Sequence, residues 1–298
     1  MQQQEPTSEQ WTTRTLLSWA TTWLTERGCD APRLDSELLL ADALGLRRLD
    51  LFLDPQRPLT PDELATFKPL LQRRGRREPV AHILQRREFW KGSFHLEPGV
   101  LVPRPDTEIL VETALERWPE PMTDTPPFRL LDLGVGSGVL LLSVLQERPD
   151  CVGTGVDLSE TALRCTADNA QRLDLAERVT LLAGDWFQPI GKAERFHTIV
   201  GNPPYISDAD YATLEPEVRD WEDALALRGG PDGLEPYRAL IPEAVARLHP
   251  GGLLALEIGE AQGEEVAALF TNNGLSGVEI RRDYGDHDRV VVGTLPKS

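Results

Sequence analysis

The chain has few cysteines, no long apolar run and no excess of positive charge. Its three cysteines, Cys29, Cys151 and Cys165, are odd in number and lack the spacing of metal ligands, which speaks against a disulfide framework or a metal centre. No stretch approaches the roughly 18 consecutive apolar residues of a membrane span, and Met1–Glu5 lacks the basic and apolar segments of a secretory signal. We therefore expect a cytoplasmic protein that does not enter a membrane.

Negative charge dominates the sequence, which has a net charge of −17 at pH 7. Broad binding to a nucleic-acid backbone needs a positive field, so direct binding to DNA is not expected. The one obvious basic patch consists of Arg73, Arg74, Arg76 and Arg77, followed by Arg86 and Arg87. Two interpretations of this patch stay open: a solvated helix end, or a docking surface for an RNA-associated partner.

The length of 298 residues, 40% of them hydrophobic, indicates two domains with a sizeable core. Residues 1–80 carry helical patterns, including a helix start at Thr60–Glu63 with an N-cap, a proline and two acids. Residues 81–103 contain short extended pieces separated by glycine and proline, which predicts a β-hairpin linker. Residues 104–298 form the remaining, larger part.

This larger part alternates apolar strands with amphipathic segments. Such alternation predicts an α/β fold with a doubly wound, mostly parallel sheet. No helix lies between the last two strands, which predicts one antiparallel strand in a sheet of seven. The expected strands are Arg129–Leu133, Val152–Val156, Val179–Leu182, Phe196–Val200, Leu253–Ile258, Val278–Arg282 and Arg289–Thr294.

A glycine-rich turn follows the first of these strands and precedes a helix. Gly134, Gly136 and Gly138, with Val135 and Ser137 between them, permit a sharp turn and a close approach of ligand to backbone. The helix start behind the turn favours a negative ligand group. We predict that these five residues bind a nucleotide-like cofactor.

Acidic residues end the next two strands. Asp157 stands where an acid can accept both hydroxyls of a ribose, although it could also be the N-cap of the following helix. Asp185 and Trp186 could hold an adenine by its amino group and its face, although Trp186 could equally belong to the core. These features fit NAD and S-adenosylmethionine alike, and the G-x-G-x-G spacing favours S-adenosylmethionine.

The strand Phe196–Val200 runs into Asn202-Pro203-Pro204-Tyr205. Two prolines cannot continue a sheet ladder, so the strand must end here, at the edge where α/β sheets bind their ligands. An amide side chain, carbonyls without competing N–H groups and an aromatic face suit a planar group that carries an NH2. The alternative interpretation is a simple strand-ending turn.

Together, Gly134–Gly138, Asp157 and Asn202–Tyr205 resemble the class I S-adenosylmethionine-dependent methyltransferases that act on amino groups, which have a Rossmann-like fold. Two upstream segments, Arg87–Trp90 and Pro103–Glu108, are similar more narrowly to the HemK/PrmC family. Leu34–Gly45 and Arg282–Val290 also match that family, which usually has a glycine near Gln85. Its members methylate N5 of the glutamine in the Gly-Gly-Gln motif of class I peptide chain release factors.

The resemblance implies roles for individual residues. The Asn202 side-chain carbonyl and the Pro203 main-chain carbonyl accept the two N–H bonds of the glutamine, Tyr205 packs on its amide plane, and Pro204 stiffens the loop. S-adenosylmethionine gives the methyl group and leaves as S-adenosylhomocysteine. The helical domain docks the release factor, and the enzyme is expected to act as a monomer. Asp106 and Thr107 either line the substrate entrance or serve as hinge and capping residues.

Other functions stay open. A glutamine methyltransferase of a large-subunit ribosomal protein shares the Asn-Pro-Pro-Tyr element but has Ser-Pro-Ile-Ala where this chain has Pro105-Asp106-Thr107. An adenine-N6 nucleic-acid methyltransferase is expected to have a basic face. A non-catalytic cofactor-binding scaffold has no need of the amide clamp, and an NAD oxidoreductase is disfavoured by the glycine spacing.

Overall fold

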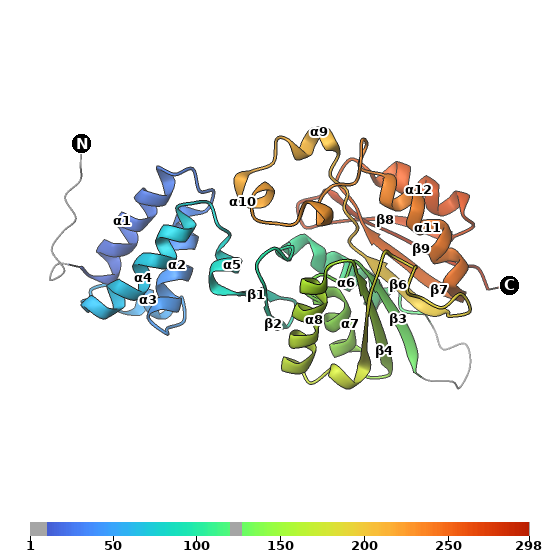
Figure 1. Cartoon of the computed structure of the whole chain (residues 1–298), viewed down its shortest axis with the longest axis horizontal. Coiled ribbons are helices and arrows are strands. Elements are labelled where there is room, and N and C mark those ends of the chain that lie inside the picture. Colours follow the sequence, from blue (N-terminus) through green and yellow to red (C-terminus); the bar gives the residue numbers. More distant parts are fainter. Residues whose placement is uncertain (1–10, 120–126, 298) are drawn as a thin grey trace. The chain divides into compact units, whose positions relative to one another are not determined.

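The structure is a computed structural model that describes residues 11–119 and 127–297. It separates into two compact units (Figure 1). The first contains the residues up to Gln85 together with Pro216–Trp221, and the second contains Arg86–Glu215 and Glu222 onward. In the described ranges, none of the helices is long and apolar enough to cross a membrane.

The first unit is helical. Its core contains Leu24, Leu39, Leu40 and Phe67, all at most 2% exposed. The predicted helix start at Thr60 is confirmed: its hydroxyl accepts the Glu63 N–H, and Glu63 in turn accepts the Thr60 N–H, which forms a capping box. Its helices are α1 (Thr13–Thr25), α2 (Pro32–Ala43), α3 (Asp50–Leu53), α4 (Pro61–Arg74), α5 (Val80–Leu84) and α10 (Pro216–Arg219).

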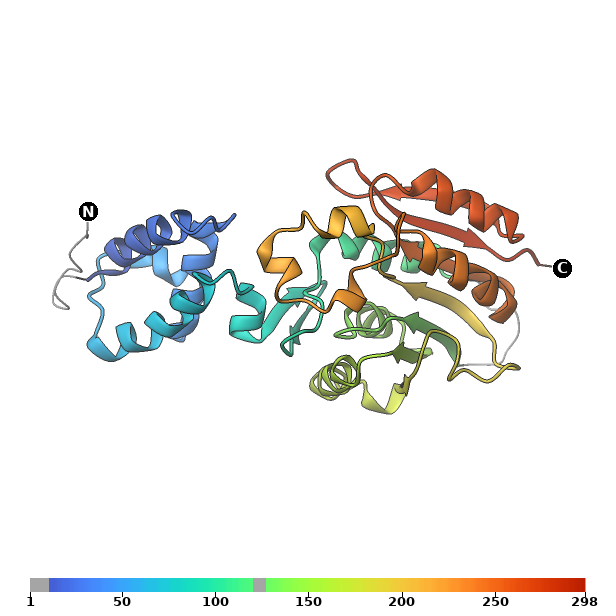
Figure 2. The ribbon, with the colours of Figure 1, turned by 45° about the horizontal axis from the view of Figure 1, so that its top comes forward.

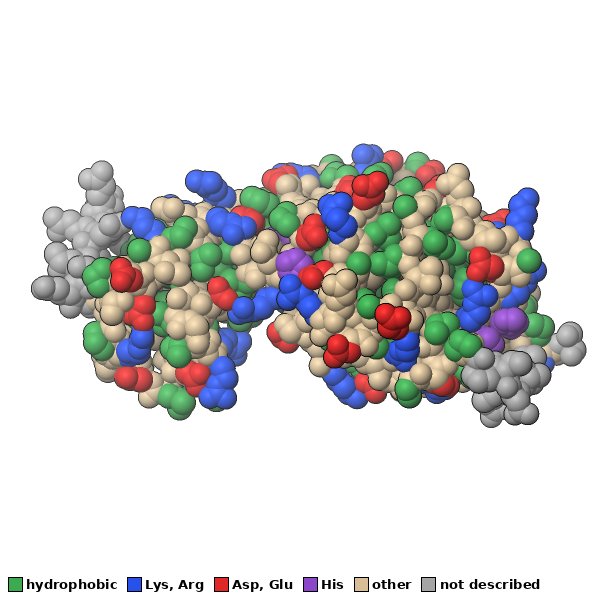
Figure 3. All heavy atoms as spheres, turned by 60° about the horizontal axis from the view of Figure 1, so that its bottom comes forward, with side chains coloured by type: hydrophobic (Ala, Val, Ile, Leu, Met, Phe, Trp, Pro, Cys, Tyr) green, Lys and Arg blue, Asp and Glu red, His purple; other side chains and the backbone are tan. Residues whose placement is uncertain are grey.

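The basic patch at the end of α4 is engaged in ion pairs within this unit. Arg74 is buried, and its guanidinium donates to Asp35 (2.7 Å) and to Glu217 (2.9 Å). Arg73 donates to Glu78, and Arg77 pairs with Glu217. The patch is therefore mostly neutralised by neighbouring acids. Figure 3 likewise shows Lys and Arg side chains interspersed with Asp and Glu on the face it presents.

Gln85 ends α5 in the left-handed conformation, with φ of 53°. This conformation favours glycine because a Cβ atom is strained there. A glycine would adopt this backbone without strain, whereas this chain accepts a modest strain at Gln85.

The second unit begins with a two-stranded antiparallel hairpin, β1 (Arg86–Phe89) and β2 (Gly92–His95). It continues into a seven-stranded sheet of order β5-β4-β3-β6-β7-β9-β8, in which β9 alone runs antiparallel to both its neighbours. The prediction of a mostly parallel sheet with one antiparallel strand is confirmed. Its strands are β3 (Phe128–Leu133), β4 (Cys151–Asp157), β5 (Val179–Ala183), β6 (Phe196–Gly201), β7 (Leu248–Glu257), β8 (Ser276–Arg282) and β9 (Asp288–Thr294).

Helices cover both faces of this sheet (Figures 1 and 2). One face carries α6 (Glu108–Glu116), α7 (Val139–Glu147) and α8 (Glu160–Arg172), and the other carries α11 (Glu235–Arg247) and α12 (Gly263–Asn272). Shorter elements are α9 (Asp208–Tyr211) and 3₁₀ turns at Pro105–Thr107, Ala176–Arg178 and Ala224–Ala226. The strand order reverses between β3 and β6, and ligands of open α/β sheets bind at the carboxyl edge of such a reversal.

Candidate active site

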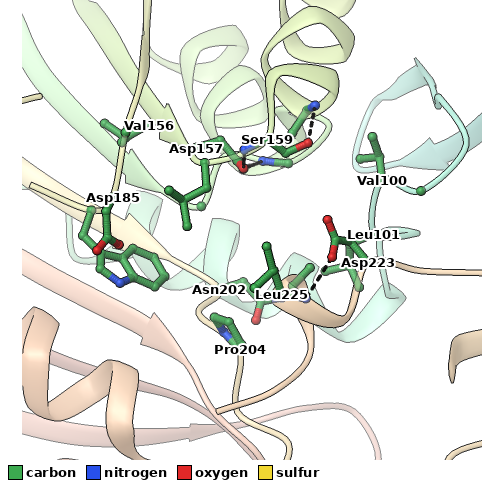
Figure 4. A pocket seen from close by; sticks show the side chains of 18 residues that line it. Val100, Leu101, Val156, Asp157, Ser159, Asp185, Asn202, Pro204, Asp223 and Leu225 are labelled. Atoms are coloured by element: carbon green, nitrogen blue, oxygen red, sulfur yellow. Dashed lines mark hydrogen bonds between the residues drawn. The ribbon is translucent and has the colours of Figure 1, made fainter. Parts of the chain in front are cut away.

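A pocket of about 350 Å³ lies at the carboxyl ends of β3, β4, β5 and β6. Figure 4 shows Asp157 and Ser159 on one side of it, with Asn202 and Pro204 on the opposite side. Val100 and Leu101, which follow the hairpin, and Asp223 and Leu225 complete its wall. Residues from distant parts of the sequence therefore meet in one cavity of the second unit.

The glycine turn has the backbone that its composition predicts. Gly134, Gly136 and Gly138 all have positive φ, and a Cβ on Gly138 would lie 2.8 Å from Thr166 Cγ2. Gly134 and Gly136 line the pocket. Val135 and Ser137 are buried, so they shape the turn from behind.

Asp157 is the acid that ends β4. The Gly136 N–H donates to one of its oxygens (2.9 Å) and the Ser159 N–H donates to the other (2.8 Å). Burial raises the pKa of Asp157, while these backbone donors lower it. The N-cap of α8 is Ser159, whose hydroxyl accepts the Ala162 N–H, so the alternative N-cap role of Asp157 is wrong. Each carboxylate oxygen keeps a lone pair for a ligand.

Asp185 and Trp186 follow β5 and also line the pocket. Asp185 is exposed, and Trp186 is half-buried with its ring near the Gly134 Cα. Trp186 has φ of 45°, a left-handed conformation that costs on the order of 1 kcal/mol or more for a residue with a side chain. Trp186 also packs against a hydrophobic core cluster, so it both lines the pocket and contributes to the core.

The segment Asn202–Tyr205 begins directly after β6, as the two prolines predict. Asn202 and Pro204 line the pocket, whereas Pro203 is buried and the half-buried Tyr205 packs against a hydrophobic core cluster. The Gln262 side-chain amide donates to the Tyr205 carbonyl (3.1 Å) and holds the end of the segment. Burial raises the pKa of Tyr205 to about 12, so its phenol stays neutral at physiological pH.

A buried carboxyl stands beside Asn202, and sequence reasoning missed it. Glu257 ends β7 and is 1% exposed; because Gly201 pairs with Leu256, the next residues Asn202 and Glu257 are neighbours across the strand ends. Burial raises the pKa of Glu257 to about 7, although Thr107, Arg289 and Asn202 lower it. An acid at the end of the apolar stretch Leu253–Ile258 was the available signal.

The upstream motif Pro103–Glu108 is anchored within the same unit. Arg104 Nη2 donates to both carboxylate oxygens of Glu222 (2.9 Å each), and Glu108 accepts the main-chain N–H of Trp90 (2.8 Å). Thr107 is buried and Asp106 lies 3.9 Å from Arg289. Neither Asp106 nor Thr107 lines the pocket. Asp106 is exposed and Thr107 is buried, and both roles considered for them stay open.

The seven-stranded sheet, its glycine turn and the acid at the end of the next strand define a class I methyltransferase fold. Two family models match the chain: the PrmC N-terminal domain over residues 15–84 and the methyltransferase small domain over residues 107–229. The chain belongs to the release factor glutamine methyltransferase family.

Curated relatives carry this family assignment over almost their whole length. The release factor glutamine methyltransferase of Caulobacter vibrioides is 47% identical over 91% of this chain and 92% of its own length. That of Geobacter sulfurreducens is 42% identical over 96% of this chain and 98% of its own. One similar solved structure is that of the T. thermophilus 16S rRNA methyltransferase RsmC in complex with AdoMet and guanosine. Its TM-score is 0.50 at 20% sequence identity, and the match covers 70% of this chain and 49% of that chain. This last likeness concerns the fold alone.

Proposed function

We propose that this chain transfers a methyl group from S-adenosylmethionine to the side-chain nitrogen N5 of the glutamine in the Gly-Gly-Gln motif of class I peptide chain release factors. One observation carries the proposal: Asn202 and Pro204 face the same pocket as Asp157 and the glycine turn. An NH2-binding segment and a nucleoside-binding segment therefore share one cavity. The names of the family members supply the substrate class.

The residues present fit S-adenosylmethionine. Asp157 keeps an acceptor on each oxygen for the ribose hydroxyls, and Gly134 and Gly136 let the backbone approach a ligand closely. We assign Asp185 to the adenine amino group and the Trp186 ring to the adenine face. The bound cofactor supplies a methyl group activated by the positive sulfur and leaves as S-adenosylhomocysteine.

The acceptor nitrogen is a weak nucleophile because its lone pair is delocalised into the carbonyl. We assign the Asn202 Oδ1 and the Pro203 carbonyl to the two N–H bonds of the substrate amide, which orients the lone pair toward the methyl group. Both carbonyls also stabilise the positive charge that develops on nitrogen. The nitrogen proton becomes acidic after transfer, so a strong general base is not needed. Tyr205 packs on the amide plane, and Pro204 restricts the loop.

We propose further that the helical residues 1–80 dock the release factor, with the hairpin region 81–103 as a linker to the methyltransferase domain 104–298, and that the enzyme acts as a monomer in the cytoplasm. The family model for residues 15–84 supports a separate role for the helical part.

Labelled methyl transfer tests the proposed function. The purified chain is incubated with labelled S-adenosylmethionine and a class I release factor, or with the same factor carrying Gln→Ala in its Gly-Gly-Gln motif. We expect label in the first protein and none in the second. Label in both would refute the assigned acceptor, and preferred labelling of DNA, ribosomal RNA or a large-subunit ribosomal protein would favour the corresponding alternative.

A further inference from the structure

The carboxyl of Glu257 lies buried where the chemistry proposed above gives it no role. Glu257 ends β7, is 1% exposed and neighbours Asn202 across the parallel pair of β6 and β7. Its Oε2 is buried without a hydrogen-bond partner in the described part of the chain, and so is the Thr107 hydroxyl. A buried carboxyl oxygen without a partner is costly, so the protein needs a reason to keep Glu257 here.

Charged and titratable groups surround this carboxyl from several elements. Arg289, on β9, is paired with Asp283 (2.8 Å) and acts on Glu257 with an opposite charge. Asp106, from the 3₁₀ turn Pro105–Thr107, opposes ionisation. Burial, and to a smaller extent the charge of Glu257, raise the pKa values of the phenols of Tyr205 and of Tyr237, on α11.

An asparagine side chain has two different ends. Its oxygen accepts hydrogen bonds and its NH2 donates them, so rotation by half a turn exchanges acceptor for donors. Only the orientation with Oδ1 toward the pocket can accept a substrate N–H. A carboxylate next to the asparagine amide can only accept hydrogen bonds, so it attracts the NH2 end of the amide toward itself.

We propose that Glu257 is a positioning residue that holds the Nδ2 end of Asn202 toward β7 and thereby turns Oδ1 toward the substrate amide. The inference rests on the function proposed above for Asn202. Burial raises the pKa of Glu257, whereas Thr107 and Arg289 lower it and so favour the ionised form that this role needs. Protonated Glu257 becomes a donor and stabilises the opposite orientation of the Asn202 amide.

A pH dependence follows. Burial raises the pKa of Glu257 to about 7. The turnover number is therefore expected to rise with pH through this region, as the fraction of ionised Glu257 grows. Tyr205, with a pKa of about 12, does not titrate in the same range.

The main test is Glu257→Gln, which keeps the shape and removes the charge. We expect kcat to fall by about 10- to 100-fold, the size of effect that misplacing a reacting group produces, with cofactor affinity unchanged. The rise of kcat around pH 7 is expected to disappear. Asp132→Asn is the matched control, because Asp132 is a second fully buried acid, on β3, whose oxygen accepts the Leu141 N–H instead of facing Asn202. The kcat of the Asp132→Asn variant should keep the wild-type pH profile.

A second measurement does not depend on the acceptor protein. The side-chain NH2 signals of Asn202, assigned by their loss in Asn202→Ala, are followed by NMR against pH in the wild-type protein. We expect them to titrate near pH 7 and to stop doing so in Glu257→Gln. Asn202 signals that do not respond to pH, or a Glu257→Gln enzyme with wild-type kcat and pH profile, overturn the inference. Failure of the wild-type enzyme to label the release factor overturns the proposed function instead, while the NMR titration still decides the role of Glu257.

Discussion

The two halves of the pocket are built by different means. On the cofactor side, glycines with positive φ and backbone N–H groups surround Asp157, and the contacts link neighbouring strands. On the acceptor side, two prolines follow Asn202, and the buried Glu257 stands beside it, near the ion pair of half-buried Arg289 with buried Asp283. The first half thus offers a ligand the Asp157 carboxylate, which backbone N–H groups hold in place, and the second offers the carbonyl oxygens of Asn202 and Pro203.

Because of this difference, we expect the cofactor side to determine the affinity for the cofactor and the acceptor side to determine the rate of methyl transfer. Hydrogen bonds to a ribose exist before and after reaction, so they contribute uniform binding. Carbonyls aimed at an amide that gains positive charge act most strongly in the transition state. Substitutions in the two halves should therefore have separable kinetic effects.

The largest effect is expected for Asn202→Ala. Loss of Oδ1 removes an oriented acceptor, and kcat should fall by about 10²- to 10³-fold, as it does when one oriented transition-state contact is deleted. Cofactor affinity should stay largely intact because Asp157 and the glycine turn are untouched. Steady-state kinetics and titration calorimetry check the two quantities. Near-normal turnover would remove the basis of the amide clamp.

Asp157→Ala is expected to act on the other half. Two ribose contacts are lost, and the cofactor Kd should rise by about 10- to 100-fold if each contact contributes roughly 1 kcal/mol or somewhat more. The rate with saturating cofactor should change less than in Asn202→Ala. Ser159→Ala is the comparison variant: it removes the α8 cap, at about 1 kcal/mol of stability, but keeps the Ser159 N–H bond to Asp157, so the Kd should rise less than in Asp157→Ala. Equal losses of affinity in both variants would assign the effect to helix α8 instead.

A smaller effect concerns stability, because each half has a buried acid behind it. Burial raises the pKa of Asp132 to about 8 and that of Glu257 to about 7. Both values lie above those of the unfolded chain, so between about pH 4 and pH 8 the folded state holds more protons and stability falls as pH rises. Asp132→Asn and Glu257→Gln should each raise the free energy of unfolding at pH 8 by on the order of 1 kcal/mol and change it little at pH 4. Urea unfolding at the two pH values measures this, and equal shifts at both would contradict the titration account.

The smallest effect is expected for Tyr205→Phe. The phenol has a pKa of about 12 and stays neutral, so the ring rather than the hydroxyl should matter. We expect kcat to fall by at most about tenfold, the upper end for one hydrogen bond, whereas Tyr205→Ala should cost more. A Phe variant as slow as the Ala variant would give the hydroxyl a chemical role.

The features that could be predicted from the sequence depend on neighbours along the chain. The capping box at Thr60, the glycine turn and the strand end at Asn202 all have local causes. Ser159 rather than Asp157 caps α8, because both acid oxygens of Asp157 accept other backbone N–H groups. Asp157 and Ser159 are both residue types that cap helices, so the residue types alone did not show which of them caps α8.

The features that escaped prediction depend on strand order. Glu257 meets Asn202 only because β7 lies beside β6, and Arg289 approaches only because β9 lies beside β7. The burial of Arg74 has a similar origin, since Glu217 comes from a distant segment that belongs to the helical unit. These contacts join residues that are far apart in the sequence, so no local sequence pattern predicts them.

The central claim is that Asn202–Tyr205 hold a glutamine side-chain amide. The most direct measurement is the fate of the label when the methylated release factor is hydrolysed in strong acid. A methyl group on the carboxamide nitrogen leaves as volatile methylamine, because the amide bond is cleaved and glutamate remains. The account predicts that nearly all label appears as methylamine, and label retained on a non-volatile amino acid would contradict it.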